Sequence, residues 1–186
     1  MKIKVGVSNH HIHLKESDFK LLFGLDSKLE IKNMLSQKDQ FASTSLLTIK
    51  TDKSEISNVR VLGPFRDYTQ IEISQTDAYK LGINPPVRDS GDLDDSEIVT
   101  LIGPCGTIKT NGCIIAHRHI HISSEQKKEL NLEDIVSIKY GGIKGGILDN
   151  VKCKITPFAS IELHIDTDEA NALGIKNNDE VEINRY

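Results

Sequence analysis

Short stretches in which apolar and polar residues alternate run through the whole chain. Side chains of a β-strand point to opposite faces in turn, so this alternation is typical of strands that bury one face. We expect strands at Lys2–Val7, His11–Leu14, Leu46–Lys50, Val59–Leu62, Thr69–Ile73, Ile98–Ile102, Gly112–Ala116, His119–Ile122, Ile135–Lys139, Val151–Ile155, Ser160–Ile165 and Glu180–Ile183. Glycine, proline, asparagine and aspartate separate these segments, and no stretch reads as a long amphipathic helix. The pattern predicts a mainly β fold, a barrel or a sandwich, with short helices.

One strand–helix unit occurs twice, at an offset of 92 residues. In residues 73–83 and again in 165–175, a strand leads to an oxygen-bearing residue and then to a short helical stretch that ends in Leu-Gly-Ile. The oxygen-bearing side chain would cap the helix, and the glycine would end it in the left-handed region. Weaker copies of this unit, at residues 14–25 and 122–130, come directly after the two histidine clusters. The repeat predicts two related halves, which suits two small pseudo-symmetric β-barrels with short capping helices.

Composition places the chain among ordinary globular proteins. Of its 186 residues, 38% are hydrophobic and 27% are charged, and the net charge is −4. Apolar side chains are spread over the whole length, which excludes intrinsic disorder as the main description. The acidic balance and the lack of a basic run argue against a nucleic-acid partner. No apolar run approaches the ~20 residues of a membrane span, and the start has no signal-peptide core, so we expect a cytoplasmic protein without a membrane partner.

Three cysteines, Cys105, Cys113 and Cys153, form no Cys-x-x-Cys pair, and their number is odd. A zinc ribbon or a disulfide framework is therefore not expected. We interpret all three as buried thiols, the state in which free cysteine is most often found. No Gly-x-Ser-x-Gly motif occurs either, and no cysteine or serine has an evident local base, so the sequence gives no support to a covalent-nucleophile hydrolase.

Histidine is the unusual feature, because six of the seven histidines fall in two short clusters, each with a His-x-His motif. Residues i and i+2 of a strand share a face, so each motif can direct two imidazoles at one ion. The repeat adds a third ligand-type residue to each half. The candidate ligands are His11, His13 and Glu72 in the first half and His119, His121 and His164 in the second. Three such ligands with one open position are the arrangement of catalytic zinc. The alternative, surface imidazoles on exposed strands, does not account for two copies at corresponding places.

Arg66 follows a tight turn, and its guanidinium is suited to hold a phosphate bidentately at the mouth of the site. The alternative is a surface arginine paired with Asp67. Arg88 is a similar loop cation, and Arg88 and Asn9 are further candidates for substrate contact.

Other polar features are better explained without a site. The acidic run between residues 89 and 97 does not match an EF-hand, and the glycines of residues 141–146 lack the Walker pattern and suit a hairpin turn. His10 and His117 lie outside the same-face pairs and suit supporting or surface positions. Arg118 points away from its neighbouring histidines, which indicates a structural role.

Five ordered motifs resemble the phosphotransacylase of the propanediol-utilisation type (phosphate propanoyltransferase). They are Ser-Asn-His-His-Ile-His-Leu at 8–14, Val-Arg-Val-Leu-Gly-Pro at 59–64, Pro-Val-Arg-Asp-Ser-Gly-Asp at 86–92, Arg-His-Ile-His at 118–121 and His-Ile-Asp-Thr-Asp-Glu-Ala-Asn at 164–171. The likeness extends from about Val5 to the C-terminus. It implies two β-barrels, residues 11–117 and 118–186, with residues 1–10 crossing over into the second. It also implies acyl transfer between coenzyme A and inorganic phosphate at a two-zinc site between the barrels.

The resemblance further implies a role for each candidate residue. The set that contains Glu72 would hold one zinc, whose open position takes the coenzyme A sulfur. The set that contains His164 would hold the second zinc, with water or phosphate completing it. Arg66 matches the arginine expected beside the phosphate. Propanoyl and acetyl groups are the acyl groups expected, coenzyme A, acyl phosphate and phosphate are the only partners implied, and the family suggests a homodimer.

The chain departs from the family at two basic positions. Members commonly have arginine where this chain has His10, and lysine where it has Cys105. These changes affect the expected contacts with coenzyme A and leave the metal ligands untouched. Members housed in bacterial microcompartments carry an N-terminal targeting extension, whereas the first motif here begins within ten residues of Met1. We therefore expect a free cytoplasmic enzyme.

Two alternatives to the transferase remain open from the residues. The same ligands can activate water in a two-metal hydrolase of phosphate or thioester substrates. They can also belong to a barrel module that binds metal without catalysis, because a fold alone does not fix a function.

Overall fold

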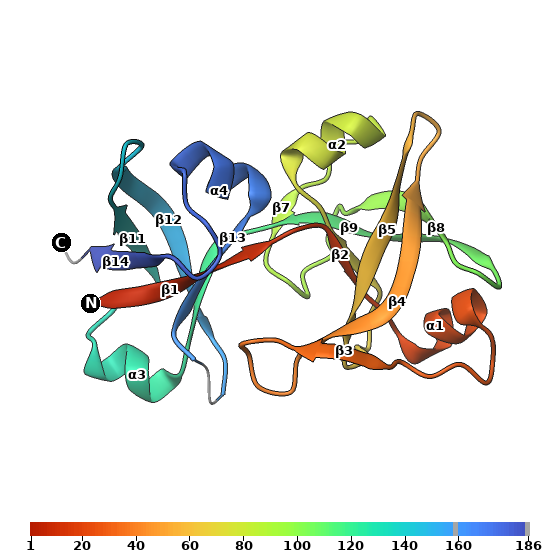
Figure 1. Cartoon of the computed structure of the whole chain (residues 1–186), viewed down its shortest axis with the longest axis horizontal. Helices are drawn as coiled ribbons and strands as arrows, with labels where there is room; N and C mark the ends of the chain where they lie inside the picture. The colour runs from red at the N-terminus through yellow and green to blue at the C-terminus, as the bar shows by residue number, and fades with distance from the viewer. Residues whose placement is uncertain (158–159, 185–186) are drawn as a thin grey trace. The chain divides into compact units, whose positions relative to one another are not determined.

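The computed structural model describes residues 1–157 and 160–184 (Figure 1). Along the chain the elements are β1 (Lys2–Ser8), β2 (His11–His13), α1 (Glu16–Phe23), β3 (Ile31–Met34), β4 (Phe41–Lys50), β5 (Glu55–Gly63), β6 (Gln70–Glu72), α2 (Gln75–Leu81), β7 (Val87–Arg88), β8 (Glu97–Ile102), β9 (Thr107–Ala116), β10 (His119–Ile122), α3 (Ser124–Glu129), β11 (Ile135–Tyr140), β12 (Gly146–Ile155), β13 (Glu162–Asp166), α4 (Thr167–Leu173) and β14 (Glu180–Asn184). The predicted mainly β fold with short helices is confirmed.

The chain forms two compact units, each built on a closed ring of six strands. One unit contains residues 10–116, and the other contains residues 1–9 with the described residues from 117 onward. In the latter, the strand order around the barrel is β1-β13-β10-β12-β11-β14. In the former, the ring runs β4-β5-β2-β6-β9-β8 and closes where β8 pairs with β4. Strand β3 adds to β4, and β7 adds to β9.

Strand pairing follows the same pattern in both barrels. The short histidine strand β2 runs parallel to β5 and antiparallel to β6, and β10 runs parallel to β12 and antiparallel to β13. The next neighbours are again parallel, β9 beside β6 and β1 beside β13. The N-terminal strand β1 thus takes in its barrel the place that β9 takes in the other, and the pseudo-symmetry expected from the repeat is present in the fold.

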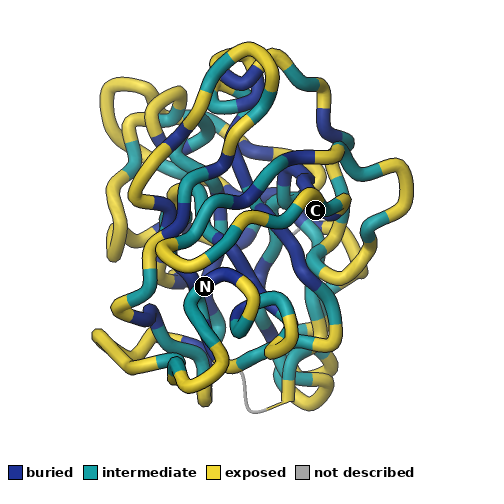
Figure 2. Tube along the Cα trace, turned by 90° about the vertical axis from the view of Figure 1, so that its right-hand side faces the viewer, coloured by how far each residue is buried: buried dark blue, intermediate teal, exposed yellow. Residues whose placement is uncertain are grey.

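Each barrel has its own hydrophobic core. Ile12 and Ile120, the middle residues of the two His-x-His motifs, are fully buried in separate clusters. Because side chains alternate along a strand, the histidines on either side of each isoleucine point away from the barrel interior. Figure 2 shows the buried residues mostly in the inner part of the trace and the exposed ones mostly on its outer turns. The cores therefore fix the strands, and the strands present the histidines on their outer faces.

Helices α2 and α4 begin and end as the repeat predicts. Ser74 and Asp166 accept hydrogen bonds from the third helical residue in reciprocal capping boxes, and Gly82 and Gly174 end the helices in the left-handed region. The weaker copies differ. Helix α1 starts after Lys15 without a side-chain cap, and α3 has a capping box at Ser123 but ends without glycine.

The smaller sequence-based expectations have mixed outcomes. The glycine-rich stretch 141–145 is the turn between β11 and β12, as expected. Strand β3 was not predicted, because all four of its residues are exposed and so show no burial alternation. Among the described residues, no helix has the length and apolar character to cross a membrane.

Candidate metal centres

The first candidate set lies on two adjacent strands of the 10–116 unit. Register places His11 of β2 directly opposite Glu72 of β6, and the His11 Nε2 atom lies 3.3 Å from Glu72 Oε2. His13 is two residues further along the same strand and is 5% exposed. One ligand atom from each of the three residues lies within 4.8 Å of the other two. The structure therefore brings together the three residues that the sequence grouped.

The second candidate set occupies the corresponding strands of the other barrel. His119 of β10 lies opposite His164 of β13, in the same register as His11 and Glu72. The Nε2 atoms of His119 and His121 are 3.2 Å apart, and the ring of His164 lies with its centroid 4.6 Å from that of His121. Ligand atoms of these three imidazoles also lie within 4.8 Å of one another.

The rings of His119 and His121 are oriented by contacts at their other nitrogen. His119 Nδ1 lies 2.8 Å from the backbone oxygen of His117, which can only accept a hydrogen bond. His121 Nδ1 lies 2.8 Å from the hydroxyl of Thr156. The carbonyl contact places the proton of His119 on Nδ1 and leaves the lone pair on Nε2, the tautomer in which Nε2 can bind a metal. The Thr156 hydroxyl can donate or accept, so its contact orients the His121 ring without selecting a tautomer.

Two polar residues beside the sets were missed by the sequence analysis. Gln70 lies two residues before Glu72 and donates from Nε2 to its Oε1 at 2.6 Å. Glu162 lies two residues before His164, with Oε2 2.7 Å from the His164 Nε2. The i, i+2 spacing that marks each His-x-His also links these residues to the third ligand, so the same-face rule would have found them.

Hydrogen bonds hold Arg66 near the end of β2. Its backbone N–H donates to Leu14, the residue after that strand. The guanidinium donates to Tyr68 Oη at 3.2 Å and to Gln40 Oε1 at 3.0 Å. The guanidinium therefore contacts Tyr68 and Gln40, whereas the alternative considered from the sequence was a pair with Asp67. A guanidinium has five N–H donors, and these two bonds orient it while leaving others for an anion.

A polar network leads from Gln70 to the loop after β7. Gln70 also donates to the Ser90 hydroxyl at 2.9 Å and accepts from the Gly91 N–H at 2.7 Å. An added Cβ on Gly91 would lie 3.4 Å from Tyr68 Oη, so this loop reaches the residue that holds Arg66. The loop thus contacts Gln70 beside the first histidine set and approaches Tyr68 beside Arg66.

The other candidate residues are placed differently. Arg88 is tied to the acidic loop, with its Nε donating to the Asp94 backbone oxygen and its side chain within 3.7 Å of Asp92 and 3.5 Å of Asp95. Asn9 is exposed between β1 and β2. A substrate contact by either residue stays a prediction.

The cysteines are not all buried, which corrects the expectation. Cys105 is exposed, with its Sγ 3.2 Å from the backbone oxygen of Phe23, and Cys153 is half-buried. Cys113 is fully buried in the core, and burial raises the pKa of its thiol to about 12. Cys105 follows Gly103-Pro104 in the turn between β8 and β9, where a side chain reaches solvent.

The residue before each His-x-His contacts the helix that follows the third ligand. His10 Nδ1 lies 3.0 Å from Asp77 of α2, and Arg118 lies 3.3 Å from Glu169 of α4. Burial acts to raise the pKa of Asp77, but the hydrogen bond and charge of His10 outweigh it and hold that pKa below its ordinary value. Burial raises the pKa of Glu169. His10 and Arg118 therefore link the ligand strands to the capping helices.

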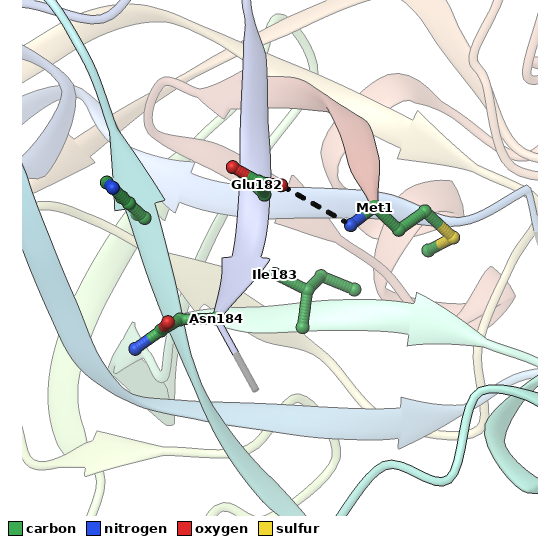
Figure 3. A pocket seen from close by; sticks show the side chains of 5 residues that line it. Met1, Glu182, Ile183 and Asn184 are labelled. Carbon is green, nitrogen blue, oxygen red and sulfur yellow. Dashed lines mark ion pairs between the residues drawn. The ribbon is translucent and has the colours of Figure 1, made fainter. Parts of the chain in front are cut away.

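A hollow lies beside β14. It is lined by Met1, Lys139, Glu182, Ile183 and Asn184 (Figure 3). The amino group of Met1 lies 3.8 Å from a Glu182 carboxylate oxygen there. None of the five lining residues belongs to either ligand set.

The chemistry of both sets fits a divalent metal such as zinc. Two imidazoles with a carboxylate, or three imidazoles, are ligand sets that catalytic zinc uses while one position stays open for substrate. The ligands come from paired strands with fully buried neighbours, so the cores hold them in place.

Comparison with known proteins shows the class to which this fold and these sets belong. The family model described as phosphate propanoyltransferase matches residues 4–176. A phosphate propanoyltransferase of Rhodopseudomonas palustris is 44% identical over 185 residues, covering 98% of this chain and 82% of that protein. Proteins of the same name from Thermotoga maritima and Levilactobacillus brevis are 43% and 42% identical, covering 97% and 95% of this chain and 88% and 86% of their own lengths.

The protein is thus an acyltransferase. It belongs to the phosphate propanoyltransferase family, as the five sequence motifs indicated.

Proposed function

We propose that this protein interconverts acyl phosphate plus coenzyme A with acyl-coenzyme A plus phosphate, by direct transfer at two zinc centres. Propanoyl and acetyl groups are the proposed acyl groups. The observation that carries the proposal is the pair of matching three-ligand sets, each on the outer face of equivalent strands, in a chain of this family. Cobalt and nickel also suit these ligands, and zinc is the metal proposed.

Each set has a proposed role. His11, His13 and Glu72 hold the ion at which coenzyme A binds, and the three-histidine set holds the ion at which phosphate binds. When bound, zinc lowers the pKa of a coordinated thiol and stabilises negative charge on phosphate oxygens. The hydrogen bonds at Nδ1 of His119 and His121 keep those rings in the orientation that binding needs.

Arg66 is the proposed catalytic residue for the phosphate. Each terminal nitrogen of its guanidinium donates one hydrogen bond, to Tyr68 or to Gln40, which leaves donors for two oxygens of a phosphate. As the bond between the acyl carbon and the phosphate oxygen breaks, negative charge grows on the leaving phosphate. A fixed guanidinium stabilises that charge without having to reorganise.

The proposed transfer needs no acyl-enzyme. The thiolate sulfur attacks the acyl carbon, a carbon–sulfur bond forms, and the carbon–oxygen bond to phosphate breaks with its electron pair leaving on phosphate. Neither ligand set contains a cysteine or a serine, and the core thiol of Cys113 is buried with a high pKa. The two ligand sets and Arg66 instead position the two substrates. Such positioning can supply a large share of the lowering of the activation barrier.

The test separates this reaction from its two alternatives. Zinc-replete protein is given propanoyl phosphate or acetyl phosphate, with and without coenzyme A, and thioester and phosphate are measured separately. The proposal expects thioester and phosphate in equal amounts, and neither when coenzyme A is omitted. Phosphate release without coenzyme A would establish a hydrolase, and tight zinc binding without any turnover would establish a binding module.

A further inference from the structure

Glu162 is a buried carboxylate that faces the second histidine set. It begins β13, pairs with His121 of the adjacent strand β10, and has a side chain that is 10% exposed. Its Oε2 atom lies 2.7 Å from the His164 Nε2. Burying a carboxylate costs free energy unless a hydrogen bond or an opposite charge compensates for it. Its position therefore calls for an explanation in terms of the group that it contacts.

The first barrel has Gln70 at the equivalent place. Gln70 pairs with His13 as Glu162 pairs with His121, and it is fully buried. Its amide donates to the carboxylate ligand Glu72, whereas the carboxylate of Glu162 accepts from an imidazole ligand. In each barrel the residue two positions before the third ligand thus has the hydrogen-bonding character that complements that ligand.

The number of carboxylates also makes the two ligand faces equivalent. The face formed by His11, His13, Gln70 and Glu72 carries one carboxylate. The three imidazoles of the second set carry none, and Glu162 brings that face to one carboxylate as well. A divalent cation at either place then meets the same formal charge.

The neighbouring strand leaves room for this pair. Gly6 of β1 lies opposite His164, and an added Cβ there would be 3.2 Å from the His164 Nε2 and 3.3 Å from the Glu162 carboxyl carbon. Both contacts are closer than ordinary van der Waals distance. The absence of a side chain at this position is what lets the carboxylate and the ring lie together.

We infer that Glu162 is a positioning residue for His164 and supplies the second centre with the carboxylate charge that Glu72 gives the first. The inference deepens the proposed function and rests on it. A carboxylate that accepts from one nitrogen of a histidine ligand fixes the ring and raises the basicity of the other nitrogen, which for His164 is Nδ1. Loss of such a partner typically weakens metal binding roughly 10- to 100-fold.

The test measures zinc affinity at the second centre alone. The parent protein carries His13→Ala and Glu72→Ala, which remove two ligands of the first set, and Glu162→Gln is added to it. Zinc is titrated into both proteins in competition with a chromogenic chelator. The expected result is a dissociation constant raised roughly 10- to 100-fold by Glu162→Gln. Glu180→Gln is the matched control, because Glu180 is a surface carboxylate of the same barrel that pairs with Lys4. It should leave zinc binding unchanged.

A pair of swaps distinguishes positioning from general damage to the fold. His164→Glu alone sets two carboxylates side by side and should bind zinc poorly. Adding Glu162→Gln recreates the arrangement of Gln70 and Glu72, and should recover at least tenfold of the lost affinity. Thermal melting of each variant checks that it is folded.

The outcomes distinguish a failure of the role of Glu162 from a failure of the proposed function. If Glu162→Gln binds zinc as tightly as its parent, or the double swap binds no better than His164→Glu, the role of Glu162 is wrong and the proposed function stands. If the parent itself binds no zinc while the wild type shows the transferase reaction without metal, both are wrong.

Discussion

The Nε2 atom of His11 lies 3.3 Å from the Oε2 atom of Glu72, across the antiparallel pair of β2 and β6. The same register joins His119 to His164 in the other barrel. Two residues far apart in the sequence become direct neighbours because, in each barrel, the chain passes through a short helix and antiparallel strands and then returns to pair with the histidine strand. The candidate centres are therefore a consequence of the repeated strand order.

Removing one imidazole of the second set should remove one metal. His119→Ala should lower bound zinc from two ions per chain to one and reduce acyl-coenzyme A formation by at least roughly 100-fold, because three ligands hold the ion and two do not. Elemental analysis and a thioester assay measure both effects. His117→Ala is the matched control, since it keeps the backbone oxygen that contacts His119 Nδ1 and should keep both metals. Full zinc and full activity in His119→Ala would show that the assignment is wrong.

Arg66 should matter for rate and not for metal content. Arg66→Ala should lower kcat by roughly 10²- to 10³-fold, the cost of losing one group that stabilises developing negative charge. Arg66→Lys should recover only part of this loss, because a lysine cannot make the contacts to Gln40 and Tyr68 and also present two donors to phosphate. Zinc content should equal that of the wild type in both variants. An Arg66→Ala variant with an unchanged kcat would contradict the proposed role.

A side chain at Gly6 should weaken zinc binding by the three-histidine set. Gly6→Ala places a methyl group 3.2 Å from the His164 Nε2, so the ring must move or the strand must shift. We expect weaker zinc binding by the three-histidine set and unchanged binding by the first set, measured by chelator competition. Gly141→Ala serves as the control, because a Cβ at that turn residue meets nothing within 4 Å. Equal zinc affinities in the two variants would argue against the tight packing of β1 on this set.

Much of the site and the general fold could be predicted from the sequence, because both depend on local rules. The His-x-His spacing and the repeat offset grouped all six candidate ligands, and the capping residues of α2 and α4 marked two helices. Strand β3 gave no signal, since its residues are all exposed. The partners of Arg66 could not be predicted either, because Gln40 approaches through the tertiary fold from a distant segment.

The thiols offer an independent check on the cores. Burial raises the pKa of Cys113 to about 12, so almost none of it is thiolate between pH 7 and pH 9, and the reactive form of the residue is the thiolate. Cys105 is exposed and should be alkylated by iodoacetamide in the folded protein, while Cys113 should react only after denaturation. Peptide mass spectrometry identifies the modified residue at each pH. Rapid alkylation of Cys113 in the native protein would contradict its burial.

The need for both zinc ions is tested by the rate of acyl-coenzyme A formation as zinc is returned to chelator-stripped protein. We expect no thioester formation in the metal-free protein and a rate that reaches its maximum when two zinc ions are bound per chain. Metal-free protein that forms thioester at the full rate would contradict this expectation.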